Sequence, residues 1–222
     1  MNVSVIIPTL NEAESITGAI ASVGMGVEII VADGGSTDGT ARVADALGAQ
    51  VYLTPPGRGG QMDEAASMAT GDCLVFLHAD TRLPEGWLKA VSDTLKDGRV
   101  AGGAFRLSID CEGMVFRLIE GVATLRSRLL KLVYGDQIIF ARKNAFLKAG
   151  GFRKLPLMED VDCVKRLRGQ GRFVLLSQRA ATSARRWRAE GILKNTLKNW
   201  LTLMLYLAGV SPERLCRWYY KR

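Results

Sequence analysis

With 222 residues, of which 48% are hydrophobic and 24 are glycine, the chain is long enough for one α/β domain, with or without an appendage. It does not open with a charged segment followed by an apolar one, which argues against secretion. Its four cysteines form no CxxC pair, which argues against a zinc site or a disulfide framework and favours a cytoplasmic protein; they are Cys73, Cys111, Cys163 and Cys216. The net charge of +8 comes from residues 179–222, which hold 10 of the 30 basic but 2 of the 22 acidic residues, so anionic lipid, a phosphorylated ligand and nucleic acid all suit it electrostatically.

Short apolar runs alternate with helical segments in the first third of the chain. The predicted strands cover residues 3–7, 29–32, 50–53 and 73–77. Capping-box spacings at Thr9/Glu12 and Asn11/Glu14 predict a helix start after the first strand. Strands that alternate with helices of about a dozen residues indicate βαβ units, a parallel sheet and a ligand site at the carboxyl ends of the strands.

The rest of the chain is less regular. Residues 100–109 and 134–152 are predicted strands on either side of a helix over 113–133, and a later helix ends at Gly169 or Gly171. From Ile192 onward, apolar residues recur at helical spacing. We therefore expect a main domain over 1–190 and an amphipathic, basic helical segment over 191–222.

Three loops at predicted strand ends carry groups that suit a phosphorylated ligand. "DGGSTDGT" begins at Asp33 and offers backbone N–H groups to a nucleotide or phosphate, although Asp33 can equally cap its own turn. "PPGRGGQ" places Arg58 between glycines in what we expect to be a mobile loop. "LVFLHADTRLP" presents His78 and Asp80, and a lone Asp80 suffices for a metal whose other ligands are phosphate and water.

Two later motifs are candidates for catalysis. "MEDVD" places Glu159 and Asp160 at a helix start, where the helix dipole alone favours acids; Asp160 is the candidate general base. "SARRWR" contains Arg186 and Trp187, a cation beside an aromatic ring that suits a diphosphate or an acceptor ring but also an ordinary basic surface.

In chain order, these segments resemble glycosyltransferase family 2 over about residues 2–190. They are Pro8-Thr9-Leu10-Asn11-Glu12, the segment that starts at Asp33, His78-Ala79-Asp80, Glu159-Asp160 and Arg186-Trp187. The resemblance is greatest to a small bacterial branch with Leu-His-Ala-Asp-Thr in place of Asp-x-Asp. It implies a Rossmann-like GT-A fold and inverting transfer from a nucleotide-diphosphate sugar with Mg²⁺ or Mn²⁺.

The resemblance also implies a role for each motif. Nucleotide-binding residues would be Pro8, Thr9, Glu12, Asp33, Arg58 and His78. Asp80 matches the metal-holding aspartate, and Asp160, next to Glu159, matches the general base. Arg186 and Trp187 would contact the acceptor or the diphosphate.

Three departures from the family pattern qualify these roles. Gly34 stands where a second aspartate is common, which weakens a uridine-specific interpretation. His78 stands where the first aspartate of Asp-x-Asp would be. Ser183 stands in place of the glutamine of Gln-x-x-Arg-Trp, which favours single addition over processive synthesis.

Other functions remain open at this point. A non-catalytic sugar-nucleotide or membrane-surface binding protein of the same fold is one, and a sugar-phosphate nucleotidylyltransferase is another, although the acidic, glycine-free loop after the first strand disfavours it. No nucleic-acid motif accompanies the basic tail. The apolar run 200–210 is too short to span a bilayer and predicts either contact with an anionic membrane, on its inner face, or a homodimer.

Overall fold

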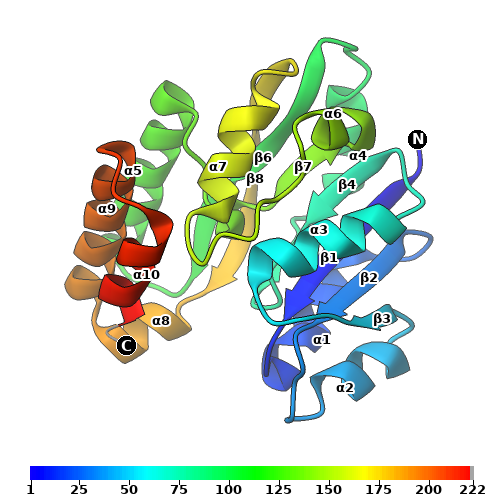
Figure 1. The fold of residues 1–222 in the computed structure, drawn as a ribbon, viewed down its shortest axis with the longest axis horizontal. Helices are drawn as coiled ribbons and strands as arrows, with labels where there is room; N and C mark the ends of the chain where they lie inside the picture. The colour runs from blue at the N-terminus through cyan, green and yellow to red at the C-terminus, as the bar shows by residue number, and fades with distance from the viewer. Residues whose placement is uncertain (221–222) are drawn as a thin grey trace.

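The computed structural model describes residues 1–220, which fold around one eight-stranded sheet with helices on both faces (Figure 1). The strand order is β3-β2-β1-β4-β7-β6-β8-β5. The strands are β1 (Val3–Thr9), β2 (Glu28–Asp33), β3 (Gln50–Leu53), β4 (Cys73–Phe76), β5 (Thr81–Arg82), β6 (Val100–Asp110), β7 (Ile139–Arg142) and β8 (Arg172–Ser183). The predicted α/β class is confirmed.

The first four strands form the parallel half of the sheet. β1 lies between β2 and β4, and its last residue, Thr9, pairs with Asp33 at the end of β2. β1 is buried along its whole length because its β-branched residues face a helical layer on each side. Helices α1 (Ala13–Val23), α2 (Thr40–Ala46) and α4 (Trp87–Thr94) cover one face; α3 (Arg58–Met68), α6 (Lys143–Lys148) and α7 (Glu159–Leu167) cover the other.

The other half of the sheet is mixed. β7 runs antiparallel to both β4 and β6, whereas the long strands β6 and β8 run parallel and end together at the pair Asp110 and Ser183. Residues 134–152 were predicted as strand, but only β7 is extended. A short 3₁₀ turn over Gly135–Gln137 precedes it and helix α6 follows it. The apolar run of β7 dominates the local pattern and hides both boundaries.

The start of α1 also differs from the prediction. Its N-cap, Glu12, makes no side-chain capping bond. Instead, the Glu12 N–H donates to Thr40 Oγ1 (2.8 Å) and the Ala13 N–H donates to Asp38 Oδ2 (3.0 Å). Because Asn11 has a positive φ of 56°, the chain turns toward the loop after β2, and that loop supplies the caps.

The C-terminal region is helical, as expected. Helix α5 (Met114–Leu130) lies beside α8 (Arg185–Glu190), α9 (Ile192–Leu207) and α10 (Pro212–Tyr220) on the left of Figure 1. Leu203, Leu215 and Tyr219 pack against Met158 and Val161 at the start of α7. Residues 191–220 are therefore attached to the main body by an apolar cluster, and residues 221–222 of the predicted segment lie outside the described part of the chain.

Replacing Gly103 in β6 by alanine should destabilise the fold. A Cβ at this position would overlap the Val174 carbonyl oxygen and the Phe140 ring, and a strand carbonyl cannot move without disturbing the ladder. Overpacking of this kind costs about 1–3 kcal/mol. Urea unfolding of Gly103→Ala measures the loss. Gly98→Ala, where nothing lies near the added Cβ, is the control and should unfold like the parent; equal stability of the two variants would contradict the packing described for β6.

Candidate active site

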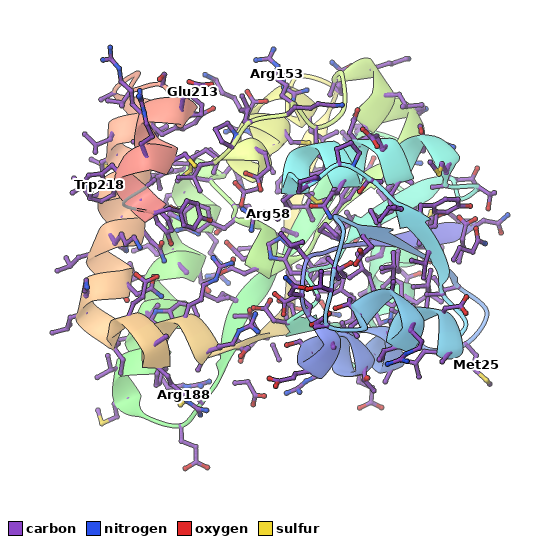
Figure 2. The ribbon with its side chains drawn as sticks, turned by 60° about the horizontal axis from the view of Figure 1, so that its bottom comes forward. Met25, Arg58, Arg153, Arg188, Glu213 and Trp218 are labelled. Atoms are coloured by element: carbon purple, nitrogen blue, oxygen red, sulfur yellow. The ribbon has the colours of Figure 1, made fainter. Side chains whose placement is uncertain are left out.

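Two adjoining hollows lie at the carboxyl ends of the parallel strands. The first, here called the outer cleft, is bordered by Pro8, Thr9, Glu12, Gln61 and Pro156. The second, here called the inner cavity, is bordered by Tyr134, Asp136, Asp160, Trp187, Asn195 and Asn199. Both share Arg58, His78, Asp80, Arg186 and Tyr220, so these five residues lie where the hollows meet. Figure 2 shows Arg58 near the middle of the molecule, between the sheet and the C-terminal helices.

Asp33 lies behind Thr9, which borders the outer cleft. Its carboxylate accepts hydrogen bonds from Thr9 Oγ1 (2.9 Å), from the Gly35 N–H (2.9 Å), and from both the N–H (2.7 Å) and hydroxyl (2.6 Å) of Ser36. Burial alone would raise the pKa of Asp33, but these hydrogen bonds outweigh it and hold the pKa below its ordinary value. Asp33 thus stays ionised as the cap of its own turn, and Thr9, not Asp33, reaches the cleft.

Gln61 explains why Gly34 follows Asp33. The Gln61 amide donates to the carbonyl oxygens of Thr9 and Ala32, both at 2.8 Å, and so joins β1, β2 and α3. A Cβ on Gly34 would lie 3.1 Å from Gln61 Nε2 and 3.3 Å from the Thr9 oxygen. The space that an aspartate at position 34 would need is occupied by this amide.

Arg58 is the first residue of α3, because the chain enters the helix directly after Gly57. It is therefore not in a mobile loop as predicted. Its guanidinium forms an ion pair with the buried Glu159. Glu159, predicted to be catalytic, is therefore occupied in holding Arg58 at the junction.

Asp160 has the environment expected of a proton acceptor. Its Oδ2 accepts a hydrogen bond from the Gly135 N–H at 2.7 Å, and its Oδ1 accepts one from the Val161 N–H at 2.7 Å. Burial, followed by the charge of Glu159, raises the pKa of Asp160 to about 6, against the opposing effects of Arg58 and the two N–H groups. A carboxylate poised near neutral pH in a cavity is typical of a general base.

His78 packs against the same turn. Its imidazole lies so close to Gly135 that a Cβ there would overlap the ring. Burial, and then the cations of Arg58 and Arg186, hold the pKa of His78 well below its ordinary value. The imidazole is therefore neutral, and it packs between the end of β4 and the turn that holds Asp160.

Asp136 is a site residue that the sequence prediction missed. It borders the inner cavity, and its Oδ1 is buried without a hydrogen-bond partner among residues 1–220. Burial raises the pKa of Asp136, and the neighbouring charge of Asp80 raises it further. The only signal in the sequence was an acid between Gly135 and Gln137, inside a stretch predicted to be strand. The buried Gln137, which donates to the Phe105 oxygen at 3.0 Å, anchors this turn.

Asp80 and Asp136 suit a divalent cation that is bound mainly by its substrate. No group of three or more His, Cys, Asp or Glu side chains within residues 1–220 is arranged to hold a metal by itself. Mg²⁺ on a diphosphate, however, needs only one or two protein carboxylates. The unpartnered oxygen of Asp136, within electrostatic reach of Asp80, is the kind of ligand such a cation takes.

The remaining predicted residues frame the junction. Arg186 is exposed and makes no hydrogen bond or ion pair within the described residues, so its charge is available to an anion. Trp187 is largely buried, its Nε1 donates to Thr196 Oγ1 at 3.3 Å, and it borders the inner cavity. Arg185 Nη2 donates to both carboxylate oxygens of Glu12 at 2.8 Å and lies 4.0 Å from Asp80 Oδ2.

The protonation of Asp160 is directly measurable. Carboxyl-carbon NMR of the labelled protein should show Asp160 titrating at about 6. Arg58→Gln should move this pKa upward, because the guanidinium favours the ionised carboxylate. Arg153→Gln, which alters an exposed arginine visible at the top of Figure 2, is the control and should leave it unchanged. Titration of Asp160 at the ordinary value for aspartate would contradict the environment described.

Comparison with known proteins identifies the fold. Staphylococcus aureus TarS, residues 1–349 solved with UDP, is 19% identical and superimposes with a TM-score of 0.66 over 82% of this chain and 60% of its own. Glucosyl-3-phosphoglycerate synthase from Mycobacterium tuberculosis, solved with Mn²⁺, UDP and phosphoglyceric acid, is 23% identical with a TM-score of 0.56 over 82% and 70%. The predicted GT-A fold is confirmed.

Sequence comparison identifies the family. The model of glycosyl transferase family 2 matches residues 4–154. An uncharacterized glycosyltransferase of Mycobacterium tuberculosis is 36% identical over 97 residues, which is 43% of this chain and 44% of the relative, so the match spans less than half of that protein. The family model covers more than half of the chain, and it includes the loops after β1 and β4 that border the outer cleft. The chain belongs to glycosyltransferase family 2.

Proposed function

We propose that the protein transfers a sugar from a nucleotide-diphosphate sugar to an acceptor hydroxyl, with inversion at the anomeric carbon. One observation carries the proposal: residues from α3, the end of β4, α8 and α10 meet where the outer cleft opens into the inner cavity. A donor that spans this junction has its nucleotide in the cleft and its sugar beside Asp160.

The donor's position follows from the charges. Pro8, Thr9 and Glu12 border the part of the cleft proposed for the nucleoside, with Asp33 as its support. The diphosphate would lie at the junction, against Arg58 and Arg186. Structural relatives solved with UDP support a nucleoside diphosphate as part of the donor.

Mg²⁺ or Mn²⁺ would be held by Asp80 and Asp136 together with phosphate oxygens. When bound, such an ion stabilises the charge that builds on a departing diphosphate. The presence of Mn²⁺ beside UDP in the glucosyl-3-phosphoglycerate synthase structure supports the choice of metal. In this proposal, Asp136 supplies the second carboxylate that the family pattern has at the position of His78.

The chemistry of the chain itself is a single displacement. Asp160 accepts the proton of the acceptor hydroxyl as that oxygen attacks the anomeric carbon, and its raised pKa makes the transfer favourable near neutral pH. Arg58 and Arg186 stabilise the negative charge on the leaving diphosphate. Asp160 borders the inner cavity, which favours an enzyme over the non-catalytic binding protein. The glycine-free loop after β1 still disfavours a nucleotidylyltransferase.

The place of action and the division of the chain are also proposals. The four cysteines are free thiols, which supports a cytoplasmic protein. Within residues 1–220, no helix has the length and apolar character needed to cross a membrane. We retain a main domain over 1–190 and a C-terminal helical segment from 191, and we propose that this segment closes the acceptor side, because Asn195, Asn199 and Tyr219 border the inner cavity.

Nucleotide binding should depend on metal and on both proposed ligands. Calorimetric titration with UDP, GDP, CDP and dTDP, each with and without Mn²⁺, should give one preferred nucleotide whose binding is strengthened by Mn²⁺. Asp80→Asn and Asp136→Asn should each lower the affinity for Mn²⁺ in the presence of that nucleotide by about 10–100-fold, measured by the EPR signal of free Mn²⁺.

Asp45→Asn, at an exposed carboxylate on α2 outside both hollows, is the control for these variants. If no nucleoside diphosphate binds, the proposed function fails. If Asp136→Asn binds Mn²⁺ like the parent protein while Asp80→Asn does not, only the role of Asp136 is rejected.

Asp160→Asn should bind the donor normally but lose most turnover, by about 10²–10⁴-fold, because the amide cannot accept the proton. Release of nucleoside diphosphate from the donor, with water or a panel of hydroxyl acceptors, measures this loss. In the parent protein the rate should fall as the pH drops below about 6, since protonation of Asp160 removes the base. Near-normal transfer by Asp160→Asn would reject the assignment.

A further inference from the structure

Helix α5 exposes a continuous apolar face. Its outward residues are Met114, Val115, Leu118, Val122, Leu125 and Leu129, and Met114 and Leu129 are 89% and 71% exposed. At about 100° of rotation per residue, these six positions fall within one arc of about 100°. The opposite side of α5, including Phe116 and Ala123, is buried against β6 and Trp187. The helix is therefore apolar on both its inner and its outer side.

Helix α9 repeats this pattern. Leu193, Leu197, Leu201, Met204 and Leu207 are all exposed, at 74%, 68%, 49%, 58% and 53%. Its inner side instead carries Asn195, which borders the inner cavity, and Thr202 and Leu203, which are buried. An outward stripe of this size on a second helix is not explained by the packing of the domain.

The two stripes lie on the same side of the helix pair. α5 and α9 run in the same direction because they follow the paired ends of the parallel strands β6 and β8 (Figure 1). Ile119 and Ala123 of α5 and Thr196 and Trp200 of α9 border a small cavity between the helices. With these residues facing each other and the helices parallel, both stripes project from one face of the pair.

The charges around this face are mostly positive, although Glu112 lies just before α5. Arg128 and Lys131 at the end of α5, Lys194 on α9, and Arg214 and Arg217 on α10 make no ion pair with any described residue, and Glu213 is the one acid on α10. A twofold dimer through this face would bring two mostly positive borders together. The exposed Trp218, on the outer side of the C-terminal helices in Figure 2, is a residue type typical of the membrane interface.

We propose that the outward faces of α5 and α9 together form a docking surface for an anionic membrane. The apolar stripes would enter the boundary between headgroups and acyl chains, and the surrounding cations would contact anionic headgroups. The surface extends beyond the basic C-terminal segment, since about half of it comes from α5 in the middle of the chain. It is independent of the proposed chemistry, because no residue of either stripe borders the outer cleft or the inner cavity.

Flotation of the full chain with phosphatidylcholine vesicles, with and without phosphatidylglycerol, tests the proposal. The parent protein should float with the anionic vesicles and much less with the neutral ones. Leu125→Asp and Leu197→Asp should each lower the bound fraction at least about tenfold, since a charged group replaces an inserted aliphatic one. The control variants are Met25→Asp, on the opposite end of the molecule in Figure 2, and Leu53→Asp, at the end of β3 in Figure 1. Both alter exposed apolar residues and should float like the parent.

A second variant keeps the test independent of the aliphatic positions. Arg128→Glu combined with Lys194→Glu leaves both stripes intact and should abolish the preference for anionic vesicles. Thermal unfolding of every variant confirms that it is folded. Failure of the parent to float, equal binding of the stripe variants, or a stable dimer in sedimentation velocity that Leu125→Asp dissociates would each overturn the proposal; the last would make this face a self-association surface.

Discussion

The hydrogen bond from the Gly135 N–H to Asp160 is the contact on which the geometry of the site depends. Together with the packing of His78 on Gly135, it joins three parts of the chain that are distant in sequence. The 3₁₀ turn at Gly135 places Asp136 at the inner cavity. The His78 ring packs against the same glycine. A side chain at position 135 would separate the end of β4 from the start of α7. The metal candidate and the proton acceptor are thus positioned by one small turn, and Gln137 holds that turn to β6.

Around this turn, some charged side chains form ion pairs with each other and others remain available to a ligand. Glu159 is paired with Arg58, and Glu12 is paired with Arg185, so these acids fix cations in place and do not compete for a ligand. Asp80, Asp136 and Asp160 remain directed at the cavities, as does Arg186. Burial raises the pKa of Asp136 and raises that of Asp160 to about 6. Both ions of a metal–diphosphate pair would find partners of opposite sign at the junction.

The C-terminal helices connect the site to the outside of the molecule. α9 presents Asn195 and Asn199 to the inner cavity, and the Tyr219 hydroxyl donates to Asn199 Oδ1 at 2.7 Å, so this wall is a hydrogen-bonded unit. The other side of the same helix is the exposed aliphatic stripe. A helix that is polar toward the acceptor side and apolar toward solvent brings the proposed acceptor wall and the proposed docking surface within one helix diameter of each other.

The sequence by itself determined the α/β class, the strands β1 to β4, the loops that end them and the family, because buried β-branched runs and strand-end motifs are local signals. It also placed Asp80, Asp160 and Arg186 among the site residues, and the structure brings these three to the border of one cavity. Only the tertiary structure decided which acids are free: Glu159 is neutralised by an arginine 101 positions away, Asp33 caps a turn, and Asp136 is left without a partner. It alone aligned the stripes of α5 and α9. Ion pairing, burial and the relative direction of two helices are set by contacts between distant segments, which no local pattern records.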